Sequence, residues 1–231
     1  ANKYKIPKLR NIDQFKNALI NIKKYEDKCE EIYEQCHENK ISIISLIDKN
    51  YPNKFKTIKD MPSILYVKTK QKSNLDWPEN ENIGIVGSRD ANKEVLDWTF
   101  QIAKELCNNC FNVISGLAKG VDTSAHMGSL EISGKGITTA VIPNTIEISP
   151  VSNRDLADQI IHNNGLIISE NAPNVPFNSK QFIQRNRIIS ALTCDYLIVP
   201  HCKINSGTLS TIKYAIKLNK KILIPKGHAS T

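Results

Sequence analysis

The sequence predicts an α/β protein with a doubly wound parallel sheet and a small helical region at its N-terminus. From residue 83 onward, short apolar runs alternate with helical segments, as in sheets whose two faces are both covered by helices. All ten glycines lie at or after Gly84, which indicates a change of architecture. We therefore expect an N-terminal helical region (1–40), a connecting segment with an edge strand (41–82) and a Rossmann-like domain (83–231).

The N-terminal region is predicted from helical spacing. Apolar residues recur among charged ones with the period of an amphipathic helix from about Asp13 to Glu38, in one piece or two. The run "ISIISLID" (41–48) fits a strand or a helix, and the sequence leaves both open. "SILYVKT" (63–69) is typical of an edge strand.

The Rossmann-like domain follows a regular order of strand, turn and helix. Near-continuous apolar runs predict six strands, at 82–88, 111–116, 136–143, 165–170, 195–200 and 220–226. Helical patterns between them predict helices at 94–107, 121–133, 153–163, 179–193 and 207–219.

Small polar residues collect where four of these strands end. In parallel sheets, ligands bind in the crevice beyond the carboxyl ends of the strands. Glycine lets the backbone approach a ligand, helix N-termini attract anions, and an arginine fork fits a phosphate. The sequence therefore predicts an anion site made by Gly87-Ser88-Arg89, Ser115-Gly116, Ser169-Glu170 and Asn205-Ser206-Gly207-Thr208.

Charge and motif content narrow the function classes. The net charge is +8, with seven lysines against Asp60 in residues 49–72 and six lysines without any acid in residues 196–231. Such a surface favours a polyanion, above all nucleic acid. The chain has neither a G-x-G-x-x-G fingerprint nor a P-loop, which argues against a dehydrogenase or an NTPase. No apolar run is long enough for a membrane span, and the six cysteines suggest free thiols in a cytoplasmic protein without a zinc site.

Two pairs of residues have alternative interpretations. Asp122 and His126 could be a base and its orienting partner, or an N-cap and a packed side chain one turn later; we favour the structural roles. Arg185 and Arg187 lie in an otherwise apolar helix and need partners. We expect Glu170 to pair with one of them and a phosphate to pair with the other.

Several motifs together resemble the DNA-processing protein A (DprA/Smf) family. The similar segments are "IGIVGSRDANKE", "VISGLAKGVDTSAHMGSL", "GLIISENAP", "FIQRNRIISALT" and "INSGTLSTIKYAIKLNKKILIPKG", and the resemblance covers roughly Ile41 to Gly227. It implies a non-enzymatic, cofactor-free protein that binds single-stranded DNA. It also implies loading of the RecA recombinase during natural transformation, and a homodimer.

The resemblance also implies site residues. Phosphate contacts would come from Ser88, Arg89, Ser115, Gly116, Lys119 and Gly120, while Arg185, Asn186 and Arg187 would line or brace the same pocket. Lys119 stands where the family usually has arginine, which keeps the charge but loses the fork. The "IPNTIEISPVSN" loop also departs from the family pattern, which puts DNA binding at that wall in question. Because the chain stops soon after the sixth strand, we expect a shortened segment or a reduced relative.

Two other functions stay open at the level of sequence. Related Rossmann proteins include nucleotide-cleaving hydrolases and sensors of nucleotide-like signals. Here Ile212 stands where a hydrolase would carry its acid, which argues against cleavage but leaves a small nucleotide ligand open. A protein-binding adaptor that uses the N-terminal helices is the third alternative.

Overall fold

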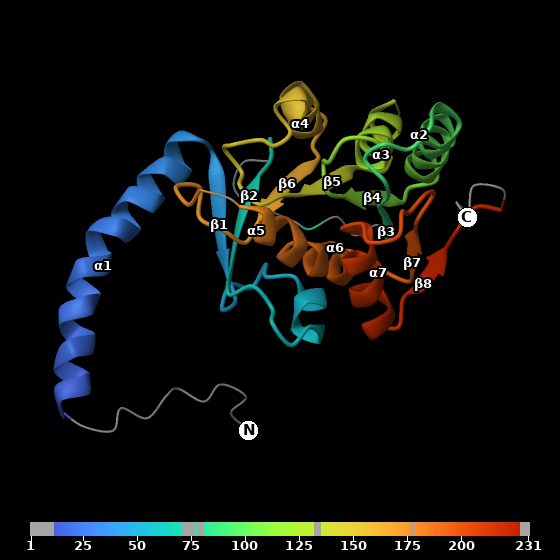
Figure 1. Ribbon diagram of the computed structural model, residues 1–231. Helices are drawn as coiled ribbons and strands as arrows, with labels where there is room; N and C mark the ends of the chain where they lie inside the picture. The colour runs from blue at the N-terminus through green and yellow to red at the C-terminus, as the bar shows by residue number, and fades with distance from the viewer. Residues whose placement is uncertain (1–11, 71–76, 78–80, 132–134, 177, 227–231) are drawn as a thin grey trace.

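The computed structural model describes residues 12–70, 77, 81–131, 135–176 and 178–226, and Figure 1 shows their arrangement. Eight strands form one sheet in the order β1-β2-β6-β5-β4-β3-β7-β8. Their bounds are β1 Ile41–Ser45, β2 Ile64–Lys68, β3 Asn82–Ile85, β4 Asn112–Ser115, β5 Thr138–Val141, β6 Leu166–Ser169, β7 Tyr196–Ile198 and β8 Lys221–Leu223.

The six strands from β6 to β8 in this order are all parallel, and helices cover both faces. The helices α2 (Lys93–Asn108), α3 (Val121–Leu130) and α4 (Arg154–His162) lie on one face, above the sheet in Figure 1. On the other face lie α5 (Ser179–Gln184), α6 (Asn186–Leu192) and α7 (Thr208–Lys217). The predicted α/β fold with a doubly wound sheet is confirmed.

Two strands before residue 82, β1 and β2, belong to the same sheet. The open question about residues 41–48 is settled in favour of a strand, β1, which is the sheet edge. The prediction that 63–69 is an edge strand is wrong, because β2 pairs antiparallel with β1 on one side and β6 on the other. The physical reason is burial: Leu65, Tyr66 and Val67 are successive residues that point to opposite faces, and all three are buried.

The structure settles the form of two predicted helices. The N-terminal helix is a single element, α1 (Ile12–Glu38), which leaves the body of the protein beside β1 (Figure 1). The helix predicted at 179–193 is two helices, α5 and α6, which meet at Arg185. This junction turns the chain beside the carboxyl ends of the strands.

Buried apolar clusters on both sides of the sheet hold these layers together. Leu65, Ile114 and Ile168 belong to the cluster under α6 and α7, and Val113 belongs to the cluster under α2 and α3. Near Gly128, α3 approaches α2 so closely that a Cβ there would lie 2.1 Å from the carbonyl oxygen of Phe100. Within the part of the chain that the structure describes, no helix is long and apolar enough to cross a membrane.

Candidate functional site

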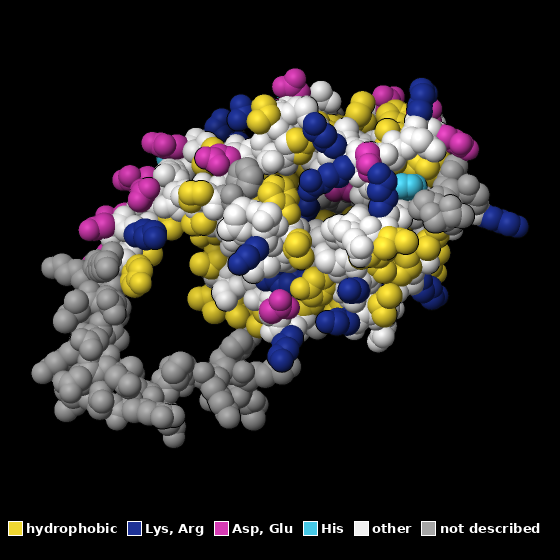
Figure 2. All heavy atoms as spheres, viewed as in Figure 1, with side chains coloured by type: hydrophobic (Ala, Val, Ile, Leu, Met, Phe, Trp, Pro, Cys, Tyr) yellow, Lys and Arg dark blue, Asp and Glu magenta, His cyan; other side chains and the backbone are white. Residues whose placement is uncertain are grey.

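A hollow of about 880 Å³ opens at the carboxyl ends of the central strands. Its walls come from the turn after β3, the turn after β4, the α5–α6 junction and the loop between β7 and α7. On the face drawn in Figure 2, lysine and arginine side chains gather around this hollow. The crevice predicted from the ends of the strands therefore exists, and its rim is cationic.

Hydrogen bonds join the turns that line the hollow. The Ser88 N–H donates to the carbonyl of His201 (3.0 Å), and the Thr208 hydroxyl donates to the carbonyl of Gly87 (3.0 Å). These bonds tie the turn after β3 to the loop after β7. Gly120, in the turn after β4, has φ 76°, and a Cβ there would lie 2.4 Å from the carbonyl oxygen of Ser88. Only glycine therefore fits where this turn passes the turn after β3.

Four cationic and two acidic side chains line the hollow. The cationic residues are Arg89, Lys119, Arg185 and Lys203, and the acidic residues are Asp90 and Asp122. Arg89 and Lys119 are exposed, and neither forms an ion pair with any residue that the structure describes. The lining therefore has an excess of positive charge that a phosphate could neutralise.

Arg185 is the buried cation of the hollow, with 5% of its surface exposed. One of its terminal nitrogens, Nη1, donates to the carbonyl of Val141, while its buried Nε has no hydrogen-bond partner among the described residues. Burial lowers the pKa of Arg185 to about 10, the charge of Asp122 opposes this shift, and Arg89 adds to it. Gly116 leaves room for the guanidinium, because a Cβ there would lie 2.1 Å from Nη1.

Asp122 lies on the same side of the hollow as Arg185. The carboxylate accepts a hydrogen bond from the Ala118 N–H (3.3 Å). Burial raises the pKa of Asp122, and the positive charge of Arg185 opposes that shift. The negative charge of Asp122 is thus buried beside the positive charge of Arg185, which stabilises it.

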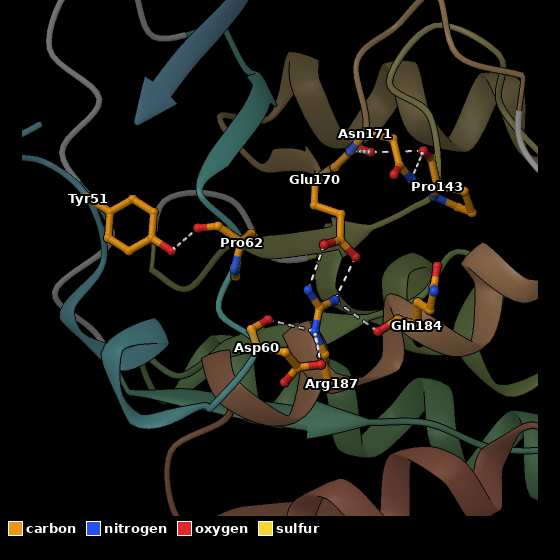
Figure 3. A network of polar contacts seen from close by, with 9 residues as sticks. Tyr51, Asp60, Pro62, Pro143, Glu170, Asn171, Gln184 and Arg187 are labelled. Carbon is orange, nitrogen blue, oxygen red and sulfur yellow. Dashed lines mark hydrogen bonds and ion pairs between the residues drawn. The ribbon is translucent and has the colours of Figure 1, made fainter. Parts of the chain in front are cut away.

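Arg187 points away from the hollow, into the network drawn in Figure 3. Its Nη1 and Nη2 each donate to one oxygen of Glu170 at 2.6 Å, and its Nε lies 2.9 Å from Oδ2 of Asp60. It also donates to the carbonyls of Asp60 and Gln184. We expected Glu170 to pair with one of the two arginines and a phosphate to pair with the other. The structure shows the first of these pairs, between Glu170 and Arg187, and places Arg185 in the lining of the hollow.

Some of the site residues predicted from sequence line the hollow, and the others lie outside its lining. The lining contains Gly87, Ser88, Arg89, Lys119, Arg185, Asn186, Ser206, Gly207 and Thr208. Outside the lining are Ser115, Gly116, Gly120 and Arg187, and also Ser169, Glu170 and Asn205, which the sequence analysis had placed in the anion site. Ser115 donates to the carbonyl of Ile85 (2.6 Å) and is fully buried, so it fixes the end of β4.

Asn186 has a bracing role as well as a place in the lining. Its amide donates to the Ser210 hydroxyl (2.7 Å) and to the carbonyl of Gly207 (3.2 Å), which ties α6 to the start of α7. Sequence reasoning missed other lining residues, namely Asp90, Ser149, Pro150, Asn178, Phe182, Ile183 and Lys203. Lys203 carried a usable signal, since it belongs to the acid-free basic stretch 196–231.

Asp122 and His126 have separate hydrogen-bond partners, the Ala118 N–H for Asp122 and the Thr138 hydroxyl for His126. His126 is fully buried, its Nδ1 lies 2.7 Å from the Thr138 hydroxyl, and burial lowers its pKa to about 3. The packed role expected for His126 is confirmed. The N-cap prediction for Asp122 is wrong: Gly120 is the N-cap of α3, and Asp122 lies inside the first turn.

The cysteines and other metal-binding residue types are dispersed. All six cysteines are free. Across the described ranges, no group of three or more His, Cys, Asp or Glu side chains is arranged to hold a metal ion.

Two solved structures resemble this fold closely. DNA processing protein A from Streptococcus pneumoniae superposes with a TM-score of 0.71 at 34% identity, over 80% of this chain and 62% of that chain. A structure that describes the single-stranded DNA binding mode of DNA processing protein A from Helicobacter pylori gives a TM-score of 0.69 at 31% identity, over 80% and 81% of the two chains.

Curated proteins with similar sequences carry the same family names as these two structures. The DNA processing protein DprA of Streptococcus pneumoniae is 34% identical over 189 residues, which are 81% of this chain and 64% of that protein. Protein Smf of Borreliella burgdorferi is 31% identical over 80% of this chain and 57% of that protein. The chain thus spans less than two thirds of the length of these two relatives. The family model of DNA recombination-mediator protein A matches residues 42–231, so the chain belongs to the DNA recombination-mediator protein A family.

Proposed function

We propose that the hollow binds the phosphates of single-stranded DNA and that the protein acts by binding, without catalysis. The observation that carries this proposal is the convergence of Arg89, Lys119 and Arg185 on one hollow at the strand ends. Arg185 is nearly excluded from water beside a like charge, and this lowers its pKa. A bound phosphate would stabilise this arrangement, because it supplies an anion for Arg89 and Lys119, which have no ion-pair partner among the described residues, and adds to the charge of Asp122 beside Arg185.

Relatives support the same ligand class. The Helicobacter pylori protein, at 31% identity, binds single-stranded DNA, and the family is described as a recombination mediator. By this relation we propose that the protein works in the cytoplasm with the RecA recombinase, and that it forms a homodimer.

A small nucleotide is the alternative ligand, because a hollow of about 880 Å³ has the size of many small-molecule sites. The two ligands differ in salt dependence. Each phosphate contact to a single strand contributes a slope of roughly −0.7 to the plot of log K against log salt. Oligonucleotide binding should therefore weaken steeply between about 50 and 200 mM salt, and a flat response favours the small ligand.

The direct experiment is Arg89→Ala with a fluorescent oligo-dT, followed by anisotropy at fixed salt. Hydrogen bonds to charged groups contribute about 1.5–3 kcal/mol, so we expect affinity to fall about tenfold or more. Lys93→Ala is the matched control, because it removes one exposed positive charge from α2 outside the hollow. Unchanged affinity in a folded Arg89→Ala protein would refute the proposed site.

A further inference from the structure

A pocket-lining ion pair joins two of the loops around the hollow. Nζ of Lys203, in the loop after β7, donates to Oδ2 of Asp90, in the turn after β3. Both side chains are more than half exposed, at 54% for Lys203 and 64% for Asp90. Both also line the hollow, so the pair lies on the surface that a ligand would contact.

A hydrogen bond from Ser88 holds the Asp90 carboxylate in this position. The buried Ser88 donates its hydroxyl to Oδ1 of Asp90 (3.0 Å), while its N–H donates to the carbonyl of His201. The hydrogen bond from Lys203, followed by the one from Ser88, lowers the pKa of Asp90. The carboxylate is thus a fixed, ionised anion beside Lys203.

The surroundings of Lys203 suit an anion larger than a carboxylate. The loop leads directly into α7, and Ser206, the N-cap Gly207 and the first helical residue Thr208 line the same hollow. Nothing lies within 4 Å of a Cβ built on Gly207, so the backbone at the start of α7 is open to a ligand. The positive end of the α7 dipole adds to the field of Lys203.

We propose that Lys203 and the start of α7 form a second phosphate subsite, and that Asp90 fills it in the free protein. A phosphate of the bound strand replaces the Asp90 carboxylate as the partner of Lys203, while Arg89, Lys119 and Arg185 hold another phosphate. This inference rests on the proposed function and extends it. The ligand it specifies is a phosphodiester strand with at least two phosphates, in preference to a mononucleotide.

The subsite predicts opposite effects for its two members. Asp90→Asn removes the competitor and should tighten oligo-dT binding about three- to tenfold. Lys203→Gln should weaken binding. Because each phosphate contact to a single strand contributes roughly −0.7 to the slope of log K against log salt, Lys203→Gln should make this slope shallower by about 0.7. In the Asp90→Asn/Lys203→Gln protein, the Asp90 substitution should give no gain over Lys203→Gln alone.

The double variant separates the subsite from a general effect of charge. If Asp90→Asn tightens binding equally with and without Lys203, Asp90 acts only through the overall field and the subsite is refuted. Asp97→Asn is the matched control, since Asp97 is 62% exposed, is paired with Lys93 on α2 and lies outside the hollow. Its affinity should equal that of the unsubstituted protein, and a gain as large as that of Asp90→Asn also refutes the subsite.

Arg89→Ala, measured alongside, separates failure of the proposed DNA site from failure of the second subsite. If Arg89→Ala leaves affinity unchanged, the hollow is not the DNA site, and both the proposed function and the subsite are refuted. If Arg89→Ala weakens binding while Asp90→Asn and Lys203→Gln have no effect, only the subsite is refuted. Competition of oligo-dT by dTMP provides a further check, because dTMP should compete poorly with a ligand that spans two subsites.

Discussion

Removal of the Glu170 carboxylate should destabilise the protein strongly. The Arg187 guanidinium, only 8% exposed, would lose both 2.6 Å contacts to Glu170. Breaking a buried ion pair by removing one partner costs about 3–5 kcal/mol. Since Asp60 and two carbonyls still contact Arg187, we expect Glu170→Ala to cost about 3 kcal/mol, at the lower end of that range.

The assay is thermal and urea unfolding followed by circular dichroism. For a chain of this size, a loss of about 3 kcal/mol lowers the melting temperature by about 6–12 °C. Asp97→Ala is the control, because its exposed pair with Lys93 contributes at most about 0.5 kcal/mol. Adding Arg187→Met to Glu170→Ala should recover part of the loss, because the unpaired buried charge is gone. A loss below about 1 kcal/mol for Glu170→Ala, or no recovery in the double variant, would contradict this reasoning.

Three further substitutions test other parts of the structure. Gly128→Ala should lower the free energy of unfolding by about 1–3 kcal/mol or more, because its Cβ would lie 2.1 Å from the carbonyl oxygen of Phe100; a urea melt that matches the original would contradict this. Gly116→Ala should displace the Arg185 side chain and weaken oligo-dT binding about tenfold with little change in stability, and anisotropy with a parallel melt measures both. His126 has a pKa of about 3 when folded and about 6.5 when unfolded, so the unfolded state binds the extra proton and stability falls as pH decreases through this range. His126→Asn should remove up to about 2 kcal/mol of the stability change between pH 6.5 and 5, and equal pH profiles for both proteins would refute the assignment.

Apolar periodicity was sufficient to predict most of the sheet. The run 165–170 has no polar residue before Ser169, as parallel strands covered on both faces require, and it forms β6. The position of β2 was not predictable in this way. The run 63–69 was predicted to be an edge strand, but its partners, β1 and β6, lie roughly 20 and 100 residues away along the chain, and no local pattern identifies them.

The site was predictable where backbone chemistry defines it. Gly87 lies in the turn after β3, Gly207 is the N-cap of α7, and both line the hollow. The different orientations of Arg185 and Arg187 could not be read from sequence, because they depend on where α5 ends and α6 begins. The pairing of Lys203 with Asp90 was unpredictable for a similar reason: the two residues lie 113 positions apart, and no local pattern links the two loops.

The insertion of β2 beside β6 has a practical consequence for anyone who wishes to work with a smaller fragment. A protein begun at Asn82, where the change in glycine content would suggest a cut, loses both β1 and β2. The backbone N–H and C=O groups of residues 167–169 that now pair with β2 would face solvent as a bare, apolar sheet edge. Such edges recruit strands from other molecules, so the shortened protein should self-associate or precipitate. Strands β1 and β2, in the segment predicted to be a connection, therefore protect the apolar edge of β6.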